Sequence, residues 1–440
     1  MPFFLRKITL SVGFFICAVY FNANALDTDP LDISDDSALR LSLVKDWLTE
    51  TPSTVLSKKP FIAELPSGDR VRVGTENSPA QNEFVIILAR ELNGAFPGWA
   101  QGSWILTRDS RTGEPEKIRV FLRSDPYTYV QFRPQSNTKS LLDVVIYDAN
   151  IVQSLIIPMT FTRLLTTPLN DIFESISERV PLKFFSPKTD NYRDSVKLIA
   201  QIRKNLPSLE YADDGAIDEN GNYVFINNLE EQTKNQGLNC SGFAKWLVDG
   251  ILRPYTGKGL EITPLKQAFG NRGSDFTEPY ERSRDPFFGL DWVRNLAATA
   301  ATVLKAPSFA SLDEIEVRDT PFSSTIKHIG KTSKIIPYVG YLPDAGYEFT
   351  GLQALLYTLA INEPGNIYLG AVNNEKMPKP RMRQYYHVAA FIPYFDEYSI
   401  FHIAVFESAV ETNFNKFRGR YTTDFINLVR IPVEKNFQPN

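Results

Sequence analysis

Between Phe61 and Tyr147 the chain is a series of short β-type segments separated by turn residues, and this pattern limits the fold more than any other feature. Apolar and polar residues alternate in runs such as GDRVRVGT and YTYVQFRP, as expected for strands with one buried face. The stretch WILTRDSRTGEPEKIRVFL predicts a hairpin that turns at Arg111-Thr112-Gly113. The sequence therefore predicts a small β-rich module, which we place at residues 26–155.

Charged residues alternate with apolar ones in this module, and a solvated sheet face is the expected place for them, with a binding groove as the alternative. These residues are Arg108, Asp109, Arg111, Lys117, Arg119 and Arg123.

The first residues are typical of a secretory signal peptide. Arg6 and Lys7 precede an apolar run over residues 8–21, and the ANA triplet at 23–25 offers a small-x-small cleavage pattern. The apolar run is short for a membrane span, although an uncleaved anchor is the alternative. We therefore expect residues 1–25 to be removed and the mature chain to be exported, to the periplasm or outside the cell, with no later membrane span.

The net charge and the length of the mature chain limit the kinds of protein that it can be. Removal of the two basic residues Arg6 and Lys7 changes the formal charge from -4 to -6, and mild acidity gives no electrostatic footprint for nucleic acid. About 415 residues exceed one typical hydrophobic core, so two domains are expected.

The second half of the chain combines helical and strand patterns. Apolar residues recur at helical spacing in TRLLTTPLNDIFESISERV and RDSVKLIAQIRKNL, which predicts a helical linker over residues 156–209. Residues 210–440 form the second predicted domain. Within it, residues 254–345 are rich in Gly, Pro and charge and predict a long insertion of loops with one helix, LDWVRNLAATAATVL. The fold class expected for the whole chain is α+β.

Cys240 is the one cysteine of the predicted mature chain, because Cys17 lies in the signal peptide. A single cysteine in an oxidising compartment is a buried inert thiol, half of an intermolecular disulfide, or a reactive group. The run CSGFAKWLVDGIL places it at the start of a predicted helix that buries Phe243, Trp246 and Leu247 on one face. Free backbone N–H groups and the helix dipole favour a thiolate at such a position.

A nucleophilic cysteine also needs a base, and the mature chain offers three histidines, His328, His387 and His402. His387 leads the predicted strand YYHVAAFIPYF, a turn at FDEYS follows, and IFHIAVFESAV predicts the return strand. A polar residue on the return strand can orient the imidazole, which makes His402 and Glu407 the candidates. His328 lies in the predicted insertion and is expected to be incidental.

The motifs around these residues carry a family resemblance. Asn-Cys-Ser-Gly-Phe at 239–243 is similar to the Asp-Cys-Ser-Gly-Phe signature of NlpC-type peptidases, a papain-like α+β family. EPGNIYL resembles that family's Pro-Gly-Asp-Leu strand, and HVAAFI resembles its Gly-His-Val-Gly-Ile-Tyr strand. The ending VFESAVETNFNKFRGRYTTDFINLVRIPV resembles that of YiiX-like relatives, where a Glu follows an apolar pair. The resemblance covers about residues 210–440, interrupted by the 254–345 insertion, and leaves out the N-terminal module.

The resemblance implies the roles of the site residues. Cys240 would be the nucleophile of a cysteine peptidase or amidase and His387 its base. Glu407 is the first choice for the third residue, and His402 is the second. The family also uses a tyrosine that helps to hold the oxyanion, and Tyr223 in GNYVFIN resembles it.

Several points of the resemblance stay open. Tyr211 is the alternative to Tyr223. Asn239 replaces the family's Asp, and Ala389 and Ala390 stand where the family often has Gly and Ile. The separation of 147 positions between Cys240 and His387 exceeds that of compact members.

Together with export, the resemblance implies cleavage of an amide bond in the stem peptides of the bacterial cell wall. The N-terminal module would then be a targeting or gating domain. Alternatives are a papain-fold amidase, acyltransferase or transglutaminase-like enzyme on another substrate, and a non-catalytic envelope binding protein. No metal or cofactor is expected, because the sequence has no His-x-x-x-His or paired-Cys spacing, no P-loop and no dinucleotide fingerprint.

Overall fold

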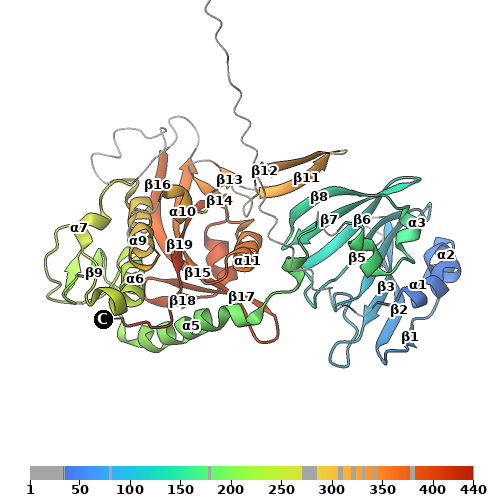
Figure 1. The fold of residues 1–440 in the computed structure, drawn as a ribbon, viewed down its shortest axis with the longest axis horizontal. Coiled ribbons are helices and arrows are strands. Elements are labelled where there is room, and N and C mark those ends of the chain that lie inside the picture. The colour runs from blue at the N-terminus through green and yellow to red at the C-terminus, as the bar shows by residue number, and fades with distance from the viewer. Residues whose placement is uncertain are drawn as a thin grey trace, which may run out of the picture.

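The computed structural model describes residues 33, 35–78, 82–176, 180–269, 285–305, 311–318, 324–329, 332–337, 341–342, 345–376 and 382–439. The predicted signal peptide, residues 1–25, lies outside them. Two large sheets with helices packed beside them make the architecture α+β, as predicted (Figure 1).

The first sheet is an antiparallel meander in which β1 to β8 pair in chain order, and it confirms the predicted β-rich character of this part of the chain. Its strands are β1 (Phe61–Glu64), β2 (Arg70–Ser78), β3 (Glu83–Arg90), β4 (Trp104–Asp109), β5 (Pro115–Val120), β6 (Thr128–Ser136), β7 (Lys139–Ile146) and β8 (Ala149–Ile157). The predicted hairpin is β4 and β5, and Gly113 adopts φ +74° at its turn.

A hairpin from the predicted insertion completes this sheet. The strands β11 (Ser324–Ile329) and β12 (Thr332–Pro337) pair with each other, and β11 runs parallel to β8. His328 lies on β11. The prediction of one helix among loops for residues 254–345 is therefore wrong, because part of this segment forms strands of the N-terminal sheet (Figure 1).

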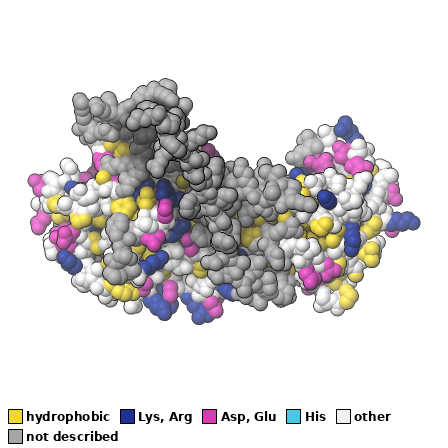
Figure 2. All heavy atoms as spheres, turned by 45° about the horizontal axis from the view of Figure 1, so that its top comes forward, with side chains coloured by type: hydrophobic (Ala, Val, Ile, Leu, Met, Phe, Trp, Pro, Cys, Tyr) yellow, Lys and Arg dark blue, Asp and Glu magenta, His cyan; other side chains and the backbone are white. Residues whose placement is uncertain are grey.

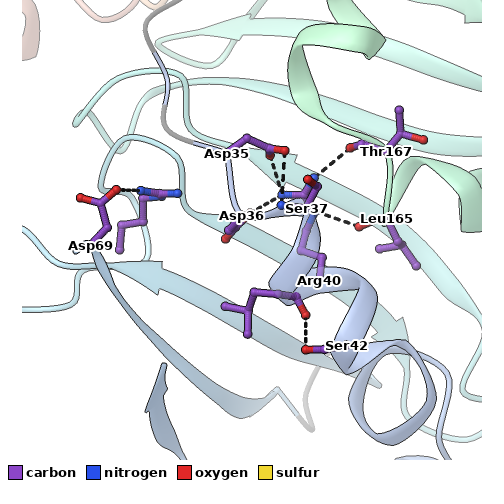
Figure 3. A network of polar contacts seen from close by, with 10 residues as sticks. Asp35, Asp36, Ser37, Arg40, Ser42, Asp69, Leu165 and Thr167 are labelled. Atoms are coloured by element: carbon purple, nitrogen blue, oxygen red, sulfur yellow. Dashed lines mark hydrogen bonds and ion pairs between the residues drawn. The ribbon is translucent and has the colours of Figure 1, made fainter. Parts of the chain in front are cut away.

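A short helix packs beside the first sheet and is fastened by a buried arginine. The helix α1 (Ser37–Leu43) continues into one π-helical turn, Val44–Leu48. The Arg40 side chain is 1 % exposed, pairs with Asp35 and Asp36, and donates to the carbonyl oxygens of Leu165 and Thr167 at 2.8 Å (Figure 3). Burying an ion pair costs desolvation free energy, and the hydrogen bonds that Arg40 makes to the two carbonyl oxygens help to offset that cost.

Two charged residues of the N-terminal module, Arg108 on β4 and Arg123 in the loop after β5, are buried rather than solvated. Arg108 is 4 % exposed and donates to the Gly113 carbonyl, and Arg123 is 8 % exposed. The expected solvated face is therefore wrong for these two arginines, because other parts of the fold cover them.

The linker is helical in short pieces, as expected. Its elements are α3 (Phe161–Leu164), α4 (Leu169–Glu174), η4 (Leu182–Phe185), η5 (Thr189–Tyr192), α5 (Arg193–Asn205) and η6 (Leu206–Ser208). Tyr192 donates from its hydroxyl to the Ala360 carbonyl at 3.0 Å, so the linker is bound to the second domain.

The second sheet carries the C-terminal half. Its strand order is β13-β14-β19-β15-β16-β17-β18. The strands are β13 (Tyr341–Leu342), β14 (Gly346–Glu348), β15 (Asn366–Lys376), β16 (Met382–Phe395), β17 (Phe401–Glu407), β18 (Val410–Thr412) and β19 (Phe425–Pro432). The predicted β16 and β17 hairpin is confirmed, with Tyr394 opposite His402. A small pair, β9 (Gly215–Ile217) and β10 (Tyr223–Phe225), stands apart.

Two long helices, α6 (Cys240–Thr256) and α9 (Phe288–Leu304), share a core with this sheet. Trp246 of α6 and Trp292 of α9 are 1 % and 0 % exposed. The helix α9 was predicted as part of an insertion, yet it belongs to the central packing of the domain. The other helices of this half are α7 (Ile262–Leu265), α10 (Leu312–Ile315), α11 (Leu352–Asn362) and α12 (Phe414–Arg420).

The two halves are joined by a continuous core and by hydrogen bonds. One hydrophobic cluster contains residues of both halves, for example Val130 of β6 and Leu355 of α11. Arg123 donates from Nη1 to the Tyr357 hydroxyl at 2.8 Å and from Nη2 to the Ser399 carbonyl. On the face in Figure 2, acidic and basic side chains are interspersed over the described surface of both halves.

Candidate functional site: a cysteine and a histidine at one cleft

The helix α6 begins at Cys240. Asn239 caps the helix in an extended conformation, and its side-chain oxygen accepts a hydrogen bond from the Gly242 N–H at 2.8 Å. The sulfur-bearing residue is therefore the first of the helix, where unpaired N–H groups and the helix dipole favour a negative charge.

Glycines let this helix start lie directly on β9. A Cβ atom on Gly242 would collide with the carbonyl oxygen of Gly215, and one on Gly215 would collide with the carbonyl oxygen of Gly237. Asn239 also donates its N–H to the Gly215 carbonyl at 3.0 Å. The glycine after Cys-Ser is therefore a packing requirement, which holds Cys240 in a fixed place.

The insertion helix adds a further contact to the same turn. Trp292 of α9 is fully buried and donates its indole N–H to the Ser241 carbonyl at 2.9 Å. A rigid first turn keeps the Cys240 side chain from sampling other positions.

A β-bulge places His387 opposite the helix start. His387 pairs with Val372 of β15, while Tyr385 pairs with Asn373, so Tyr386 is an extra residue in β16. Bulges re-aim side chains and recur beside active sites. His387 was predicted at the first position of its strand, and this is wrong, since β16 begins at Met382. The bulge is what the sequence did not reveal.

Cys240 and His387 act on each other's proton affinity. Burial alone raises the pKa of the Cys240 thiol, but the hydrogen bond and charge of His387, with the Val388 N–H and the Ser241 hydroxyl, hold it below its usual value. Burial lowers the pKa of His387, yet hydrogen bonds and charges of Cys240 and Glu407 raise it to about 9. Both shifts favour a thiolate beside an imidazolium.

Glu407 is the partner of His387 on the next strand. Its Oε2 lies 2.7 Å from His387 Nε2, which leaves Nδ1 of the imidazole for the cysteine. The other oxygen, Oε1, accepts from the Thr412 hydroxyl at 2.7 Å and from the Arg420 guanidinium. Burial raises the pKa of Glu407, but the bonds from His387, Thr412 and Arg420 lower it to about 2. The carboxylate is therefore ionised and fixed in orientation.

Aromatic residues that the sequence reasoning missed enclose the histidine. The ring of Tyr421 stacks on His387 with centroids 5.8 Å apart and planes inclined by 24°. Tyr386 donates its hydroxyl to Asp424 at 2.8 Å. Burial raises the pKa of Tyr421 to about 12, and the charges of Glu407 and Cys240 act in the same direction. No local pattern marks Tyr421 and Asp424, because they follow α12, far along the chain from the His strand, whereas Tyr386 directly precedes His387 on β16.

Cys240 and His387 line a cleft of about 580 Å³, and Glu407 reaches it only through its hydrogen bond to His387. Asn239, Cys240, Ser241, His387 and Val388 line it together with Asp214, Ile226, Asn227, Lys266, Asp285, Phe288, Gly289, Tyr385 and Tyr386. A larger cavity of about 1150 Å³ lies at the junction of the two halves and contains neither Cys240 nor His387. We take the smaller cleft as the candidate site, since among the described residues a cysteine and a histidine with a buried carboxylate partner meet there.

The other sequence-predicted residues lie elsewhere. His402 bonds Asp396 through Nε2 at 2.8 Å and stacks on Tyr394, away from Cys240. Tyr223 is on β10 and is not among the described residues that line the cleft.

Tyr211 has an electrostatic connection to the site, although it is likewise not among the described residues lining the cleft. Its hydroxyl donates to Asp213 at 2.5 Å, which raises the pKa of Tyr211, and burial and the charges of Asp213 and Cys240 raise it further.

The residues that the structure describes contain no group of three or more His, Cys, Asp and Glu that could hold a metal ion. Within the same residues, no helix combines the length and the apolarity that crossing a membrane requires.

The N-terminal half of the chain matches a known family model. Residues 30–184 match a family model described as a domain of unknown function (DUF8515). The match takes in α1, the strands β1 to β8 and most of the first linker elements, so it extends beyond the boundary expected at residue 155. Neither a search of curated proteins nor a search of solved structures found a match to the chain.

Proposed function

We propose that this protein is a cysteine-dependent hydrolase of amide bonds, with Cys240 as nucleophile, His387 as base and acid, and Glu407 as the residue that orients the imidazole. One observation carries the proposal. His387 interacts with Cys240 on one side and, at 2.7 Å, with a buried carboxylate on the other, at the start of a helix. This is the arrangement that activates a thiol nucleophile.

The chemistry follows from these positions. The Cys240 thiolate forms a bond to the carbonyl carbon, and the carbonyl electron pair moves to oxygen. Collapse of the tetrahedral intermediate breaks the C–N bond while the amine leaves with the proton of His387. The imidazole then takes a proton from water, the resulting hydroxide attacks the thioester, and the thiolate leaves. The backbone N–H of Cys240 is the proposed oxyanion donor.

A papain-like core of the NlpC type is the fold that we propose for the C-terminal half. In its favour, a helix that starts with cysteine packs on an antiparallel sheet whose successive strands carry the histidine and the carboxylate. Asn239 departs from the family's Asp, but its side-chain oxygen supplies the helix-capping acceptor that an Asp would supply. The departure thus leaves the position of Cys240 unaffected.

For the substrate, we propose the stem peptides of the bacterial cell wall, acted on after export. The resemblance of the motifs and the signal-like residues 1–25 support this choice. The cleft carries both signs of charge, with Asp214, Asp285 and Lys266 among its lining residues, as a zwitterionic peptide would require.

The test has two stages. First, the rate of Cys240 alkylation by iodoacetamide is measured against pH in the mature protein. We expect fast labelling well below the ordinary thiol pKa of about 8.5. Second, purified cell-wall sacculi are digested with the wild type and with Cys240→Ser, and soluble products are analysed by mass spectrometry. New amine and carboxyl ends released only by the wild type support the proposal. A thiol that titrates like a free cysteine contradicts it and favours the non-catalytic binding protein instead.

A further inference from the structure

The cavity at the junction of the two halves is a second feature with the character of a binding site. Its volume is about 1150 Å³, and its walls come from the first sheet, from the linker and from the turn between β16 and β17. It has no described lining residue in common with the cleft of Cys240. Pockets at the interface between domains are common places for ligands.

Exposed aromatic side chains concentrate in this cavity. Among the described residues, the most exposed aromatic side chains are Phe61, Trp99, Tyr127, Tyr211, Tyr255 and Tyr398. Three of these, Trp99, Tyr127 and Tyr398, line this one cavity, with exposures of 37 %, 52 % and 76 %. Exposed apolar surface that gathers in one concave place indicates a binding site.

The aromatic wall is fixed before any ligand arrives. Tyr127 stacks on Tyr147 with centroids 5.2 Å apart and planes inclined by 19°. Tyr147 in turn packs against Tyr357 and Phe401, each at 5.9 Å. Its backbone lies at φ +45°, which is unusual for a bulky residue and holds the ring in the turn between β7 and β8. Strain of this kind persists at functional places.

The polar groups of the cavity suit a ligand that is uncharged or carries acidic groups. Four charged side chains line it. Arg123 donates to Tyr357 and Ser399, and Asp125 accepts from the Tyr127 N–H and the Thr128 hydroxyl. Lys183 and Lys188 add two basic groups, and burial lowers the pKa of Lys183. Amide side chains line the cavity as well, from Asn93, Gln101 and Asn191. Of the described lining residues, seven are aromatic and four are aliphatic, which is a poor match to an acyl chain.

We infer that this cavity binds an oligosaccharide. A sugar ring has one face of C–H groups, which packs on an aromatic ring, and a rim of hydroxyls, which pair with amides. Ligand pockets commonly measure about 300–1,000 Å³, so a cavity of about 1150 Å³ is large enough for a ligand of more than one sugar ring. The inference does not depend on the reactivity of Cys240, because the two sites have separate walls.

Binding is tested on the mature full chain by isothermal titration and by the change in tryptophan fluorescence. The probes are the β-1,4-linked tetrasaccharides cellotetraose and chitotetraose, the α-linked maltotetraose, and an oligomer of a uronic acid. We expect saturable binding of at least one probe. Trp99→Ala and Tyr127→Ala should each weaken it about tenfold, the loss of one stacking contact.

The matched control is Tyr255→Ala, since Tyr255 is 55 % exposed but does not line the cavity. It should bind like the wild type. Cys240→Ala should also bind normally, so failure of the proposed hydrolase would leave this result intact. Absence of binding by all four probes overturns the inference, and so does binding that is equally tight in the Trp99 and Tyr127 variants. Thermal unfolding curves of each variant verify that it is folded.

Discussion

His387 and His402 occupy neighbouring strands of one hairpin and have the same local chemistry. Each has a carboxylate oxygen within 2.7–2.8 Å of Nε2, and each stacks on a tyrosine ring inclined by 24°. The environment separates them. The His387 side chain is 14 % exposed and its Glu407 partner 4 %, whereas the values for His402 and Asp396 are 42 % and 27 %. A histidine–carboxylate pair by itself therefore does not distinguish the two sites. The difference lies in the burial of the pair and in the residue that faces the histidine.

Burial strengthens the electrostatic interaction between histidine and carboxylate, because water no longer screens the two charges. An exposed pair contributes little, while a buried one shifts the proton affinity of both partners. The pKa of His387 rises to about 9 and that of Glu407 falls to about 2. In addition, only the buried pair faces a cysteine, which α6 delivers from another part of the chain.

Removal of each histidine tests the comparison most strongly. At pH 6 a free thiol of pKa about 8.5 is thiolate in fewer than about one molecule in a hundred. We therefore expect His387→Ala to slow the alkylation of Cys240 on the order of 10²-fold at this pH, while His402→Ala leaves the rate unchanged. Equal losses in both variants would mean that the fold, not the pair, sets the reactivity.

The position of Cys240 at the start of α6 depends on Gly242. A Cβ at this position would strike the backbone of β9, so Gly242→Ala should destabilise the protein by about 1–3 kcal/mol and slow alkylation as the helix start shifts. Gly419 in α12 is the control, because a Cβ there meets nothing within 4 Å. Gly419→Ala should be neutral or stabilise by up to about 1 kcal/mol. Thermal unfolding measures both, and a harmless Gly242→Ala would refute the tight packing.

The carboxylates give a third contrast, in pH dependence. The pKa of His387 is raised, so its imidazolium is present below about pH 9 and is lost above it, and hydrolysis that needs this acid should fall there. Glu407→Gln removes the charge that helps to raise this pKa, so the pKa should fall towards the ordinary value of about 6.5. Alkylation at pH 6 should slow about tenfold.

The titration of His387 followed by NMR measures this shift directly. Asp396→Asn serves as the control and should leave both the His387 titration and the alkylation rate as in the wild type. A His387 pKa that stays near 9 in Glu407→Gln would assign the shift to Cys240 alone.

Local patterns in the sequence were sufficient for part of this site. The Cys-Ser-Gly run and the following apolar spacing predicted a helix that starts at Cys240, and the FDEYS turn predicted the β16 and β17 hairpin. Both are features of adjacent residues, which periodicity and turn chemistry report. The choice between Glu407 and His402 was left open, because it depends on the strand register and on the bulge at Tyr386.

Contacts between segments that lie far apart in the chain could not be predicted from the sequence. Arg420 meets Glu407 only because α12 folds back beside β17, and β11 joins β8 across more than 160 positions. Arg123 alternates with apolar residues like a solvated strand residue, but the turn that carries Ser399 covers it. Lys245 and Asp249 look like a solvated pair on α6, yet they are 0 % and 1 % exposed and bond at 2.6 Å. Sequence spacing carries no information about which other segment will cover a face.

The smallest effect concerns the arginine behind the carboxylate. Arg420 is 48 % exposed and holds Oε1 of Glu407, whose position Thr412 also supports. Exposed ion pairs contribute about 0.2–1 kcal/mol, so Arg420→Gln should slow alkylation of Cys240 by no more than about fivefold. Arg203→Gln is the matched control, because Arg203 is 49 % exposed and pairs with Glu411, which lies outside the triad. It should have no effect on the rate. If Arg420→Gln were as damaging as Glu407→Gln, the arginine and not the part-buried Thr412 contact would orient the carboxylate, and burial alone would no longer explain why His387 differs from His402.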